Sequence, residues 1–215
     1  MSKPTQQLIY FADPMCSWCW GFSPVMTRLL DTYGSRFSLH MIMGGLRAGN
    51  TAAMDDEQKG YIRGHWEHVA ERSGQPFDWA FFDQDGFVYD TEPACRAVVT
   101  ARNLDPNLSY AMMHSVQKAF YAEGRDVTSA DVLSEIAGAV GLSAGTFRTA
   151  FDTEDARNFT AQDFQTTQQV GVPGFPTLLL GKEDEDLMVL ANGYQEYDGI
   201  AARLESALAE DSPAS

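Results

Sequence analysis

The sequence is poor in cysteine, in basic residues and in long apolar runs. It has three cysteines in 215 residues, and 15 lysines and arginines stand against 30 aspartates and glutamates, so the formal net charge is −15. A nucleic acid or an anionic membrane surface would repel such a chain, and we expect neither as a partner. No run approaches the roughly 18 apolar residues that a membrane span needs, so we expect no spanning helix.

The beginning of the chain also lacks the features of a secretory signal. Residues Met1–Gln7 are polar, whereas a signal needs a basic segment, an apolar stretch of about 7 to 15 residues and a small-residue cleavage site. We therefore expect the protein in the cytoplasm, where structural disulfides are rare. In that compartment a Cys-X-X-Cys pair is more often catalytic or metal-binding.

The sequence does contain one such pair, at a strand-to-helix turn. Cys16 and Cys19 follow the apolar run Leu8–Ala12 and precede a helical pattern. The first N–H groups of a helix have no partner within it and carry the positive end of its dipole, so a sulfur placed there is stabilised as a thiolate. We expect Cys16 to be the nucleophile and the more deeply placed Cys19 to resolve mixed disulfides.

The residues around the pair have candidate roles of their own. Ser17 can donate a hydrogen bond to the Cys16 thiolate, and Trp18 offers an apolar surface beside it. Asp13 has two interpretations. It can relay a proton to Cys19 during resolution, or it can form a turn before the following proline, which is the commoner role.

Zinc binding is the main alternative for the pair, and it needs four ligands. Beyond the pair, only Cys95 and four histidines remain, and there is no second Cys-X-X-Cys. We therefore expect redox chemistry and no metal. Cys95, on a helix predicted to begin near Pro93, is either an inert buried thiol or a third redox partner. His65 and His68 are expected on a solvated helix face.

A second stretch, Gly171–Leu180, places Phe175, Pro176 and Thr177 at the start of a short apolar strand. A proline there cannot donate to the sheet, and the tertiary amide makes the cis isomer accessible. A Cys-X-X-Cys at the start of the first helix, with Phe-Pro-Thr opening a late strand, resembles the thioredoxin superfamily. The long helical stretch between the two motifs is similar to its DsbA-like branch.

That resemblance implies a fold and a substrate site. The fold would be α/β and thioredoxin-like, with a large all-helical insertion. Pro176 would be a cis-proline facing the dithiol, and the backbone of Phe175 would pair with an extended substrate segment. The stretch Asp13–Phe22 is similar to a cytosolic-type subgroup described as protein-disulfide isomerases.

The periodicity divides the chain into segments. We expect a discontinuous thioredoxin-like domain over 5–46 and 170–209, a helical insertion over 47–169 that packs as a lid on the sheet, and a disordered tail over 210–215. Strands are predicted over 8–12, 37–43, 177–180 and 187–191, with a charged turn over 181–186. Helices of the insertion are predicted to begin near Thr91, Leu108, Thr128 and Thr153.

Two further predictions concern backbone breaks. The helix after the dithiol contains Pro24, so we expect a kink or a short first turn that restarts at Ser23, before the helix ends at Gly34. The stretch Gly44–Arg47 is expected to be a plain turn, with Arg47 near the site as the second interpretation.

Together these observations predict a thiol–disulfide oxidoreductase or isomerase that exchanges disulfides of proteins or small molecules through Cys16 and Cys19. No bound cofactor is needed, because the electrons reside in the cysteine pair, which glutathione or a thioredoxin-type partner would recycle. Two alternatives stay open. One is a glutathione-dependent isomerase or transferase on the same scaffold, and the other is a binding protein without turnover. The sequence indicates neither the direction of electron flow nor the oligomeric state.

Overall fold

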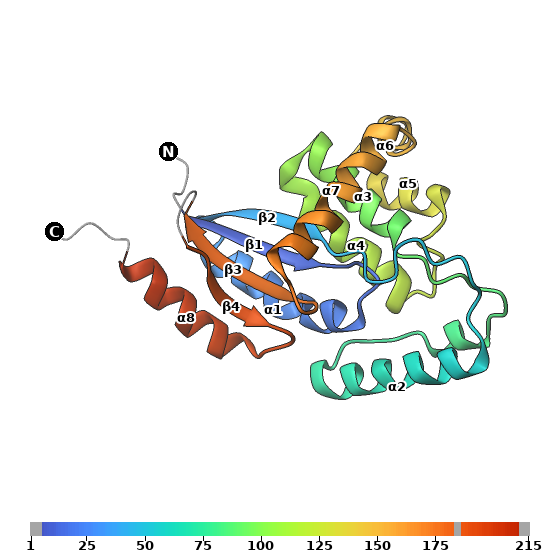
Figure 1. Ribbon diagram of the computed structural model, residues 1–215, viewed down its shortest axis with the longest axis horizontal. Coiled ribbons are helices and arrows are strands. Elements are labelled where there is room, and N and C mark those ends of the chain that lie inside the picture. The colour runs from blue at the N-terminus through green and yellow to red at the C-terminus, as the bar shows by residue number, and fades with distance from the viewer. Residues whose placement is uncertain (1–5, 183–185, 211–215) are drawn as a thin grey trace.

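A four-stranded sheet and a set of helices make up the computed structural model, which describes residues 6–182 and 186–210 (Figure 1). In chain order the elements are β1 (Gln6–Ala12), α1 (Ser17–Tyr33), β2 (Phe37–Met43), α2 (Asp56–Ser73), the 3-10 helix η1 (Trp79–Asp83), α3 (Glu92–Leu104), the 3-10 helix η2 (Pro106–Leu108), α4 (Ser109–Tyr121), α5 (Ala130–Ala139), α6 (Ala144–Phe151), α7 (Glu154–Val170), β3 (Thr177–Lys182), β4 (Met188–Asn192) and α8 (Tyr197–Glu210).

The sheet has the order β2-β1-β3-β4, with β1 parallel to β2 and antiparallel to β3. β1 is therefore an inner strand. Its last three residues, Tyr10–Ala12, are all buried, as expected where helices cover both faces of a sheet. The predicted first strand is confirmed and begins earlier, at Gln6, while β2 has the predicted bounds.

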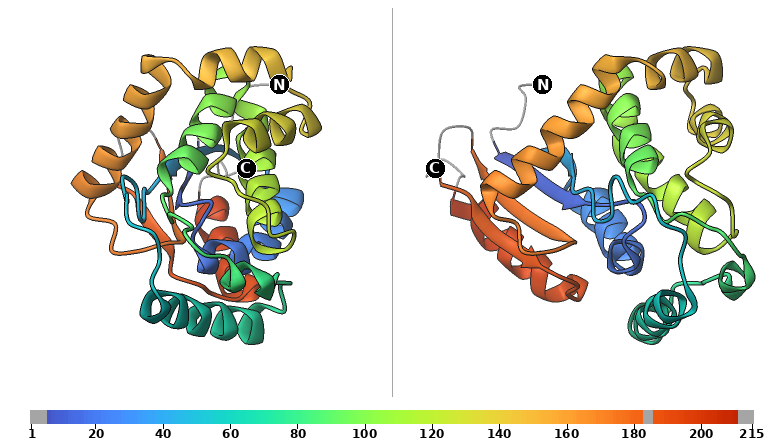
Figure 2. Two further views of the ribbon diagram at one scale, coloured as in Figure 1. Left: turned by 90° about the vertical axis from the view of Figure 1, so that its right-hand side faces the viewer. Right: turned by 45° about the vertical axis from the view of Figure 1, so that its right-hand side comes forward.

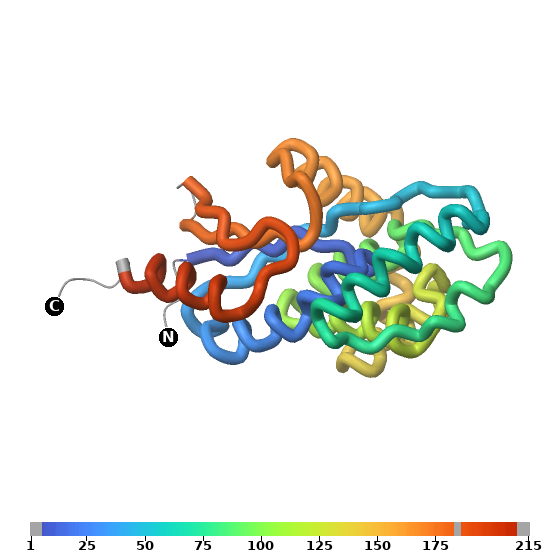
Figure 3. Tube along the Cα trace, turned by 90° about the horizontal axis from the view of Figure 1, so that it is seen from below, coloured from blue at the N-terminus to red at the C-terminus, as the bar shows by residue number. Residues whose placement is uncertain are grey.

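Helices cover both faces of this sheet. α1 and α8 contact each other on one face, and α7 crosses the opposite face and contacts β2 (Figures 1 and 2). The helices α2 to α6 follow β2 in the chain and gather beyond one end of the sheet, where β1 leads into α1 (Figure 3). In the described part of the chain, none of the helices has the length and apolar character to cross a membrane.

α1 continues through Pro24 without the predicted restart at Ser23. Proline has no N–H, so it leaves the carbonyl four residues earlier, that of Trp20, without its helical partner. The side chain of Gln75 donates to this carbonyl (3.2 Å) and also to the Ser23 hydroxyl (2.8 Å). A residue from the loop after α2 thus replaces the missing helical hydrogen bond, and Gly34 ends the helix as predicted.

The helices between β2 and β3 agree in part with the sequence-based expectation. α3 begins just after Thr91, and α7 begins after Thr153, whose hydroxyl accepts from the Ala156 N–H. The helix predicted near Thr128 is present as α5, but it begins at Ala130, two residues later, because the Thr128 N–H and hydroxyl both donate to the Asp126 carboxylate in a turn. α6 is not among the predicted helices.

An aromatic cluster fills the space between α2, α4 and the loop after α2. Trp66 of α2 is buried at its centre, 4.8 to 5.8 Å by ring centroids from a set of five aromatic side chains: Phe77, Phe81, Phe82, Phe120 and Tyr121. Tyr121 in turn stacks on Trp20 of α1, 6.2 Å away. The insertion and the helix that begins at the dithiol therefore share one core.

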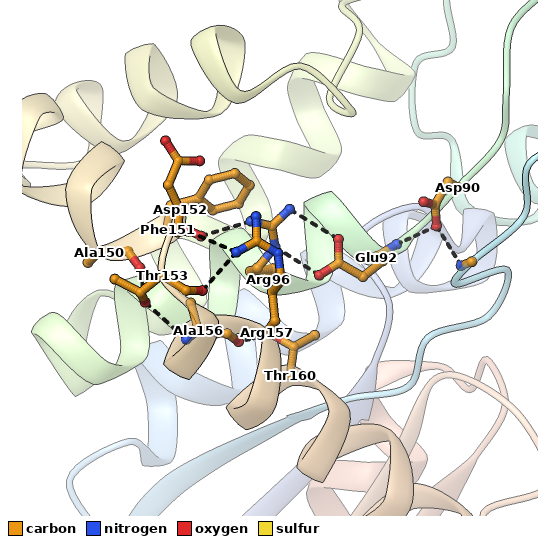
Figure 4. Close-up of polar contacts among 11 residues, drawn as sticks. Asp90, Glu92, Arg96, Ala150, Phe151, Asp152, Thr153, Ala156, Arg157 and Thr160 are labelled. Carbon is orange, nitrogen blue, oxygen red and sulfur yellow. Dashed lines mark hydrogen bonds and ion pairs between the residues drawn. The ribbon is translucent and has the colours of Figure 1, made fainter.

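A buried arginine, Arg96, ties α3 to the end of α6. Its Nε and Nη2 donate to the Glu92 carboxylate one turn earlier (2.8 and 3.2 Å), and its Nη1 donates to the Phe151 carbonyl (2.8 Å) (Figure 4). Beside it, Arg157 of α7 donates to the two carbonyls that precede its own helix. The bonds of Arg96 satisfy a charged group in a poorly hydrated place, and the bonds of the two arginines join α3, α6 and α7.

The last elements shift slightly from their predicted bounds. Gly181 and Lys182 of the predicted turn belong to β3, and residues 183–185 lie outside the described part. β4 begins at Met188, one residue later than predicted. Glu210, the first residue of the predicted disordered tail, ends α8 instead, and residues 211–215 lie outside the described part.

Candidate active site

The turn between β1 and α1 presents the Cys-X-X-Cys pair at a helix N-terminus. Cys16 is the N-cap residue of α1, with extended backbone angles (φ −92°, ψ 116°), and its carbonyl accepts the first helical bond, from the Trp20 N–H (3.1 Å). Asp13 closes the turn, because its carbonyl accepts from the Cys16 N–H (3.1 Å) and its carboxylate from the Met15 N–H (2.8 Å). The turn-forming interpretation of Asp13 therefore holds.

The two cysteines differ in their access to solvent. Cys16 retains 6% of its surface exposed and lines a cavity of about 370 Å³, whereas Cys19 is completely buried one turn further along α1. Both are free thiols. Burial raises the pKa of Cys19 well above its usual value, and the neighbouring Cys16 adds to the shift. Cys19 is therefore a protonated thiol at neutral pH.

The segment before β3 faces Cys16. The peptide bond between Phe175 and Pro176 is cis. The Phe175 carbonyl lies 3.8 Å from the Cys16 Sγ, which donates to it. The two sequence stretches that suggested the site are thus neighbours in space, although 159 positions separate Cys16 from Phe175 in the chain.

The ring of Phe175 packs on Gly44, a residue that was expected only to form part of a turn. A Cβ added at Gly44 would lie 1.9 Å from the Phe175 Cζ and 2.4 Å from both Cε atoms. Gly44 also donates its N–H to the Ala12 carbonyl (2.8 Å), which extends the pairing of β1 with β2. A residue without a side chain is therefore required where the ring crosses the end of β2.

A second cavity, of about 740 Å³, adjoins the one at Cys16. The two share Trp18, His65 and Phe175 in their walls. The larger one extends along α2 and ends at a set of residues from α2 and the segment after β4: His68, Glu71, Arg72, Gly193 and Tyr194. The dithiol therefore opens into a groove that is long enough to take more of a substrate than its sulfur.

Some residues of the helix that begins at the dithiol line the groove, and others lie in the core. Ser17 and Trp18 line the groove, and Trp18 packs on Tyr194 at 5.7 Å between ring centroids. Trp20 and Phe22, which follow in the same helix, are buried in the core. His65 and His68 lie on a helix, α2, as predicted, but α2 borders the cavities, so the face that they share is not fully open to solvent.

His65 is half-buried in the wall of both cavities, and His68 is an exposed part of the wall of the larger one. α2 reaches this position because Gly21 of α1 has no side chain. A Cβ there would lie 2.7 Å from a methyl group of Val69.

The third cysteine lies beneath the turn. Cys95 of α3 is fully buried, and its Sγ donates to the Asp13 carboxylate (3.4 Å). Burial raises the pKa of the Cys95 thiol, and the Asp13 charge adds to this effect. The structure brings Cys95 to the turn before Cys16 but not into either cavity wall. A part in redox chemistry stays a prediction, as does a proton relay through Asp13.

Tyr89, which precedes α3, lines the cavity at Cys16 and is not among the predicted site residues. Its hydroxyl donates to the Met15 carbonyl (2.6 Å) and lies 3.4 Å from the Tyr121 hydroxyl. Burial raises the pKa of Tyr89, so it stays a phenol and keeps the hydrogen bond. Nothing in the local sequence around Tyr89 marks this contact, which depends on the tertiary fold.

Across the described residues, no group of three or more histidine, cysteine or acidic side chains is arranged to hold a metal ion.

A sequence profile of the DSBA-like thioredoxin domain matches residues 7–205, which is nearly the whole chain. The chain belongs to this family. The DsbA-like fold predicted from the two motifs is therefore confirmed.

Solved structures of DsbA-like proteins agree closely with the fold. A protein from Nitrosomonas europaea, provisionally named a protein disulfide isomerase, is 32% identical, with a TM-score of 0.89 over 97% of this chain and 100% of that one. The cytosolic disulfide reductase DsbM from Pseudomonas aeruginosa is 31% identical, with a TM-score of 0.78 over 95% of this chain and 99% of that one. DsbM has also been solved with GSH.

Curated relatives have a different name. The ClpXP adapter protein SpxH of Bacillus subtilis is 27% identical over 92% of this chain and 67% of its own length. SpxH of Halalkalibacterium halodurans is 25% identical over 86% of this chain and 61% of its own length. The chain thus spans about two thirds of the length of these relatives. It is similar both to solved proteins named as a disulfide isomerase or reductase and to curated proteins named as adapters.

Proposed function

We propose that the protein is a thiol–disulfide oxidoreductase that exchanges disulfides through Cys16 and Cys19. The observation that carries the proposal is the asymmetry of the pair. Cys16 lies at a helix N-terminus in a cavity wall, and Cys19 is a buried thiol whose pKa is raised. This is the arrangement that a nucleophile and a resolving thiol need. The resemblance to DsbM and to the Nitrosomonas protein supports the same chemistry.

In this mechanism the Cys16 thiolate attacks a disulfide and forms a mixed disulfide, and one half of the substrate leaves as a thiolate. Cys19 stays protonated until then, because ionisation in its buried position is costly. It loses its proton as it attacks the Cys16 sulfur and releases the second half. The Phe175 backbone, 3.8 Å from Cys16, is where an extended substrate segment would pair.

The substrates we propose are disulfides of proteins or small molecules, with glutathione or a thioredoxin-type partner as the source or acceptor of electrons. The GSH-bound form of DsbM favours glutathione among these. The description of DsbM as cytosolic supports the same compartment for this chain. Pro176 would shape the substrate groove, with no bound cofactor.

The deciding measurement is the equilibrium of the Cys16–Cys19 pair in mixtures of reduced and oxidised glutathione, read by thiol labelling and mass spectrometry. A reversible disulfide between these two residues is expected, and a Cys19→Ser variant should accumulate a mixed disulfide on Cys16. Cys95→Ala is the matched control and should leave both results unchanged. The absence of any reversible Cys16–Cys19 disulfide would refute the proposal.

A second candidate is a binding protein that uses the fold without turnover, which the SpxH relatives favour. Cys16→Ser separates the two candidates. An oxidoreductase loses its activity toward disulfides, whereas a binding protein retains its partner when Cys16 is replaced. A glutathione-dependent isomerase or transferase, the third alternative, would retain activity with serine at this position.

A further inference from the structure

Arg47 extends from the loop after β2 into the wall of the cavity that contains Cys16, where it is half-buried. Hydrogen bonds fix the backbone of this loop. The Leu46 N–H donates to the Asp13 carboxylate (2.7 Å), and the Arg47 N–H donates to the Thr91 hydroxyl (3.2 Å). The arginine is therefore attached to the same turn that presents the dithiol.

Asp90 fixes the part of the loop that follows Arg47. One oxygen of its carboxylate accepts from the Gly49 N–H (2.8 Å) and from the Glu92 N–H (3.0 Å) at the beginning of α3, and Figure 4 shows both bonds at its right-hand side. The backbone on both sides of Arg47 is thus fixed by hydrogen bonds.

Arg47 has no acidic partner in the described part of the chain. There, ion pairs join six other arginines to carboxylates: Arg63, Arg72, Arg96, Arg102, Arg125 and Arg148. The guanidinium of Arg47 instead lies over the ring of Tyr89, 5.3 Å from its centroid. The Asp13 carboxylate beneath the loop is already occupied by two N–H groups and the Cys95 thiol.

The cavity at Cys16 has no aspartate or glutamate among its lining residues, although the chain as a whole carries 30 of them. Arg47 is the one residue of that lining with a permanent positive charge. A half-buried charge without a partner is unfavourable. A ligand carboxylate would compensate it, because the planar guanidinium donates two parallel hydrogen bonds to such a group.

We propose that Arg47 binds a carboxylate of the disulfide substrate, and that the preferred substrates are small disulfides with carboxylates near the sulfur. This inference rests on the proposed function. Arg47 is then a specificity-determining residue, which holds the substrate while Cys16 attacks. The shared wall of Trp18, His65 and Phe175 leaves room for the rest of the molecule in the larger cavity.

The reaction with a symmetrical disulfide balances without a further reductant. A bond forms between Cys16 and one substrate sulfur as the substrate S–S bond breaks, and one thiolate leaves. The Cys16–Cys19 bond then forms as the mixed disulfide breaks, and the second thiolate leaves. Two electrons pass from the cysteine pair to the substrate, and the two protons of the reduced pair pass through solvent to the two leaving thiolates.

A single-turnover experiment with the pre-reduced protein tests the inference. The rate of loss of the Cys16 and Cys19 thiols is measured with 3,3′-dithiodipropionate, which is a dianion, and with bis(2-hydroxyethyl) disulfide, which is neutral. Arg47→Gln should lower the rate constant for the dianion about tenfold or more and leave that for the neutral disulfide nearly unchanged. Arg28→Gln is the matched control, because Arg28 is exposed, packs on Tyr197 and lines neither cavity.

The other outcomes are also decisive. An equal loss with both disulfides, or no loss with either, overturns the role of Arg47 while the proposed function stands. If the wild-type protein consumes neither disulfide, the preference for small disulfides is overturned. The proposed function fails with it only if the glutathione mixtures also produce no reversible Cys16–Cys19 disulfide. If Arg47→Gln does not fold, the same two rate constants are measured with Arg47→Lys. It keeps the charge but not the paired donors, so it should show a smaller loss that is again confined to the dianion.

Discussion

Asp13 lies beneath the dithiol with no surface exposed, and it organises the turn rather than the cavity. Its carboxylate accepts from the Met15 and Leu46 N–H groups and from the Cys95 thiol. Burial raises its pKa from the usual 3.8, although the two N–H groups partly oppose the shift. The folded protein therefore binds this proton more tightly than the unfolded chain does.

That difference predicts a pH dependence of stability. The contribution of Asp13 to the free energy of unfolding is fully present below the unfolded pKa and is lost as the pH rises from about 4 through the raised folded pKa. Asp13→Asn has no such proton to bind. We expect the stability of the wild-type protein, relative to Asp13→Asn, to fall as the pH rises above about 4 in urea unfolding experiments. A difference between the two proteins that is independent of pH would contradict this.

Gly44 matters to the site because it has no side chain. In Gly44→Ala the new Cβ would meet the Phe175 ring at 1.9 Å, so the ring has to move, and its carbonyl beside Cys16 moves with it. We expect a loss of about 1–3 kcal/mol in the free energy of unfolding and slower oxidation of the cysteine pair. Urea unfolding and thiol labelling measure these effects.

Gly174→Ala is the control for this prediction. Gly174 precedes Phe175 in the same segment, but a Cβ there would meet no atom within 4 Å. Both stability and rate of oxidation should stay near those of the wild-type protein. If Gly44→Ala behaved like Gly174→Ala, the packing of Phe175 on Gly44 would not matter to the site.

At the scale of elements, the pattern of the sequence predicted those parts whose structure depends on local signals. β2 has its predicted bounds, and α7 begins after the capping residue Thr153, because side-chain periodicity and capping are both local. α5 begins at Ala130, two residues after the predicted Thr128, whose N–H donates to the Asp126 side chain. α6 is only eight residues long and was missed.

The candidate site was predictable only where residues lie within its two motifs. Cys16 and Phe175 could be paired through a resemblance, and their 3.8 Å contact agrees with it. His65 and Tyr89 enter the cavity wall from two other segments, and Arg47 from a third, as the second interpretation of Gly44–Arg47 had it. Their positions depend on close packing such as that of α2 on Gly21, and no local pattern records such contacts.

An ion pair joins three elements behind the site. Arg102 of α3 donates to both oxygens of Asp163 on α7 (2.8 and 3.0 Å) and to the Met41 carbonyl of β2, while Asp163 also accepts from the Met43 N–H (2.9 Å). The two side chains are only 24% and 11% exposed. This pair fixes the end of β2 from which Gly44 and Arg47 follow.

Arg102→Met should therefore leave a poorly hydrated carboxylate without its partner. We expect a loss of about 2 kcal/mol in the free energy of unfolding, below the range for fully buried pairs because some solvent reaches the site. The control is Arg63→Met on α2, where both partners are about half exposed (51% and 54%), and the expected loss there is at most about 1 kcal/mol. Urea unfolding of the two variants compares them directly, and equal losses would contradict the assigned role.

For the molecule as a whole, the division into a thioredoxin-like unit over 5–46 and 170–209 and a helical unit over 47–169 stays a prediction. The core crosses that division, because Trp20 of α1 stacks on Tyr121 of α4 and donates to the Pro76 carbonyl (3.0 Å). Units that share buried aromatic contacts unfold together.

We therefore predict one cooperative unfolding transition. Hydrogen exchange followed by mass spectrometry in low urea should show the amides of β1 and of α4 losing protection with the same free energy. Earlier exchange of α4, at a separate and lower free energy, would mean that the helical unit opens on its own.

The position of Trp18 also makes its fluorescence sensitive to the redox state of the cysteine pair. Its indole lines both cavities, follows Cys16 by two positions and is held against Tyr194. A nearby disulfide accepts an electron from an excited indole and quenches its light emission, whereas a pair of thiols does so far less. The fluorescence of Trp18, one of four tryptophans in the chain, is therefore expected to fall when the cysteine pair closes to a disulfide.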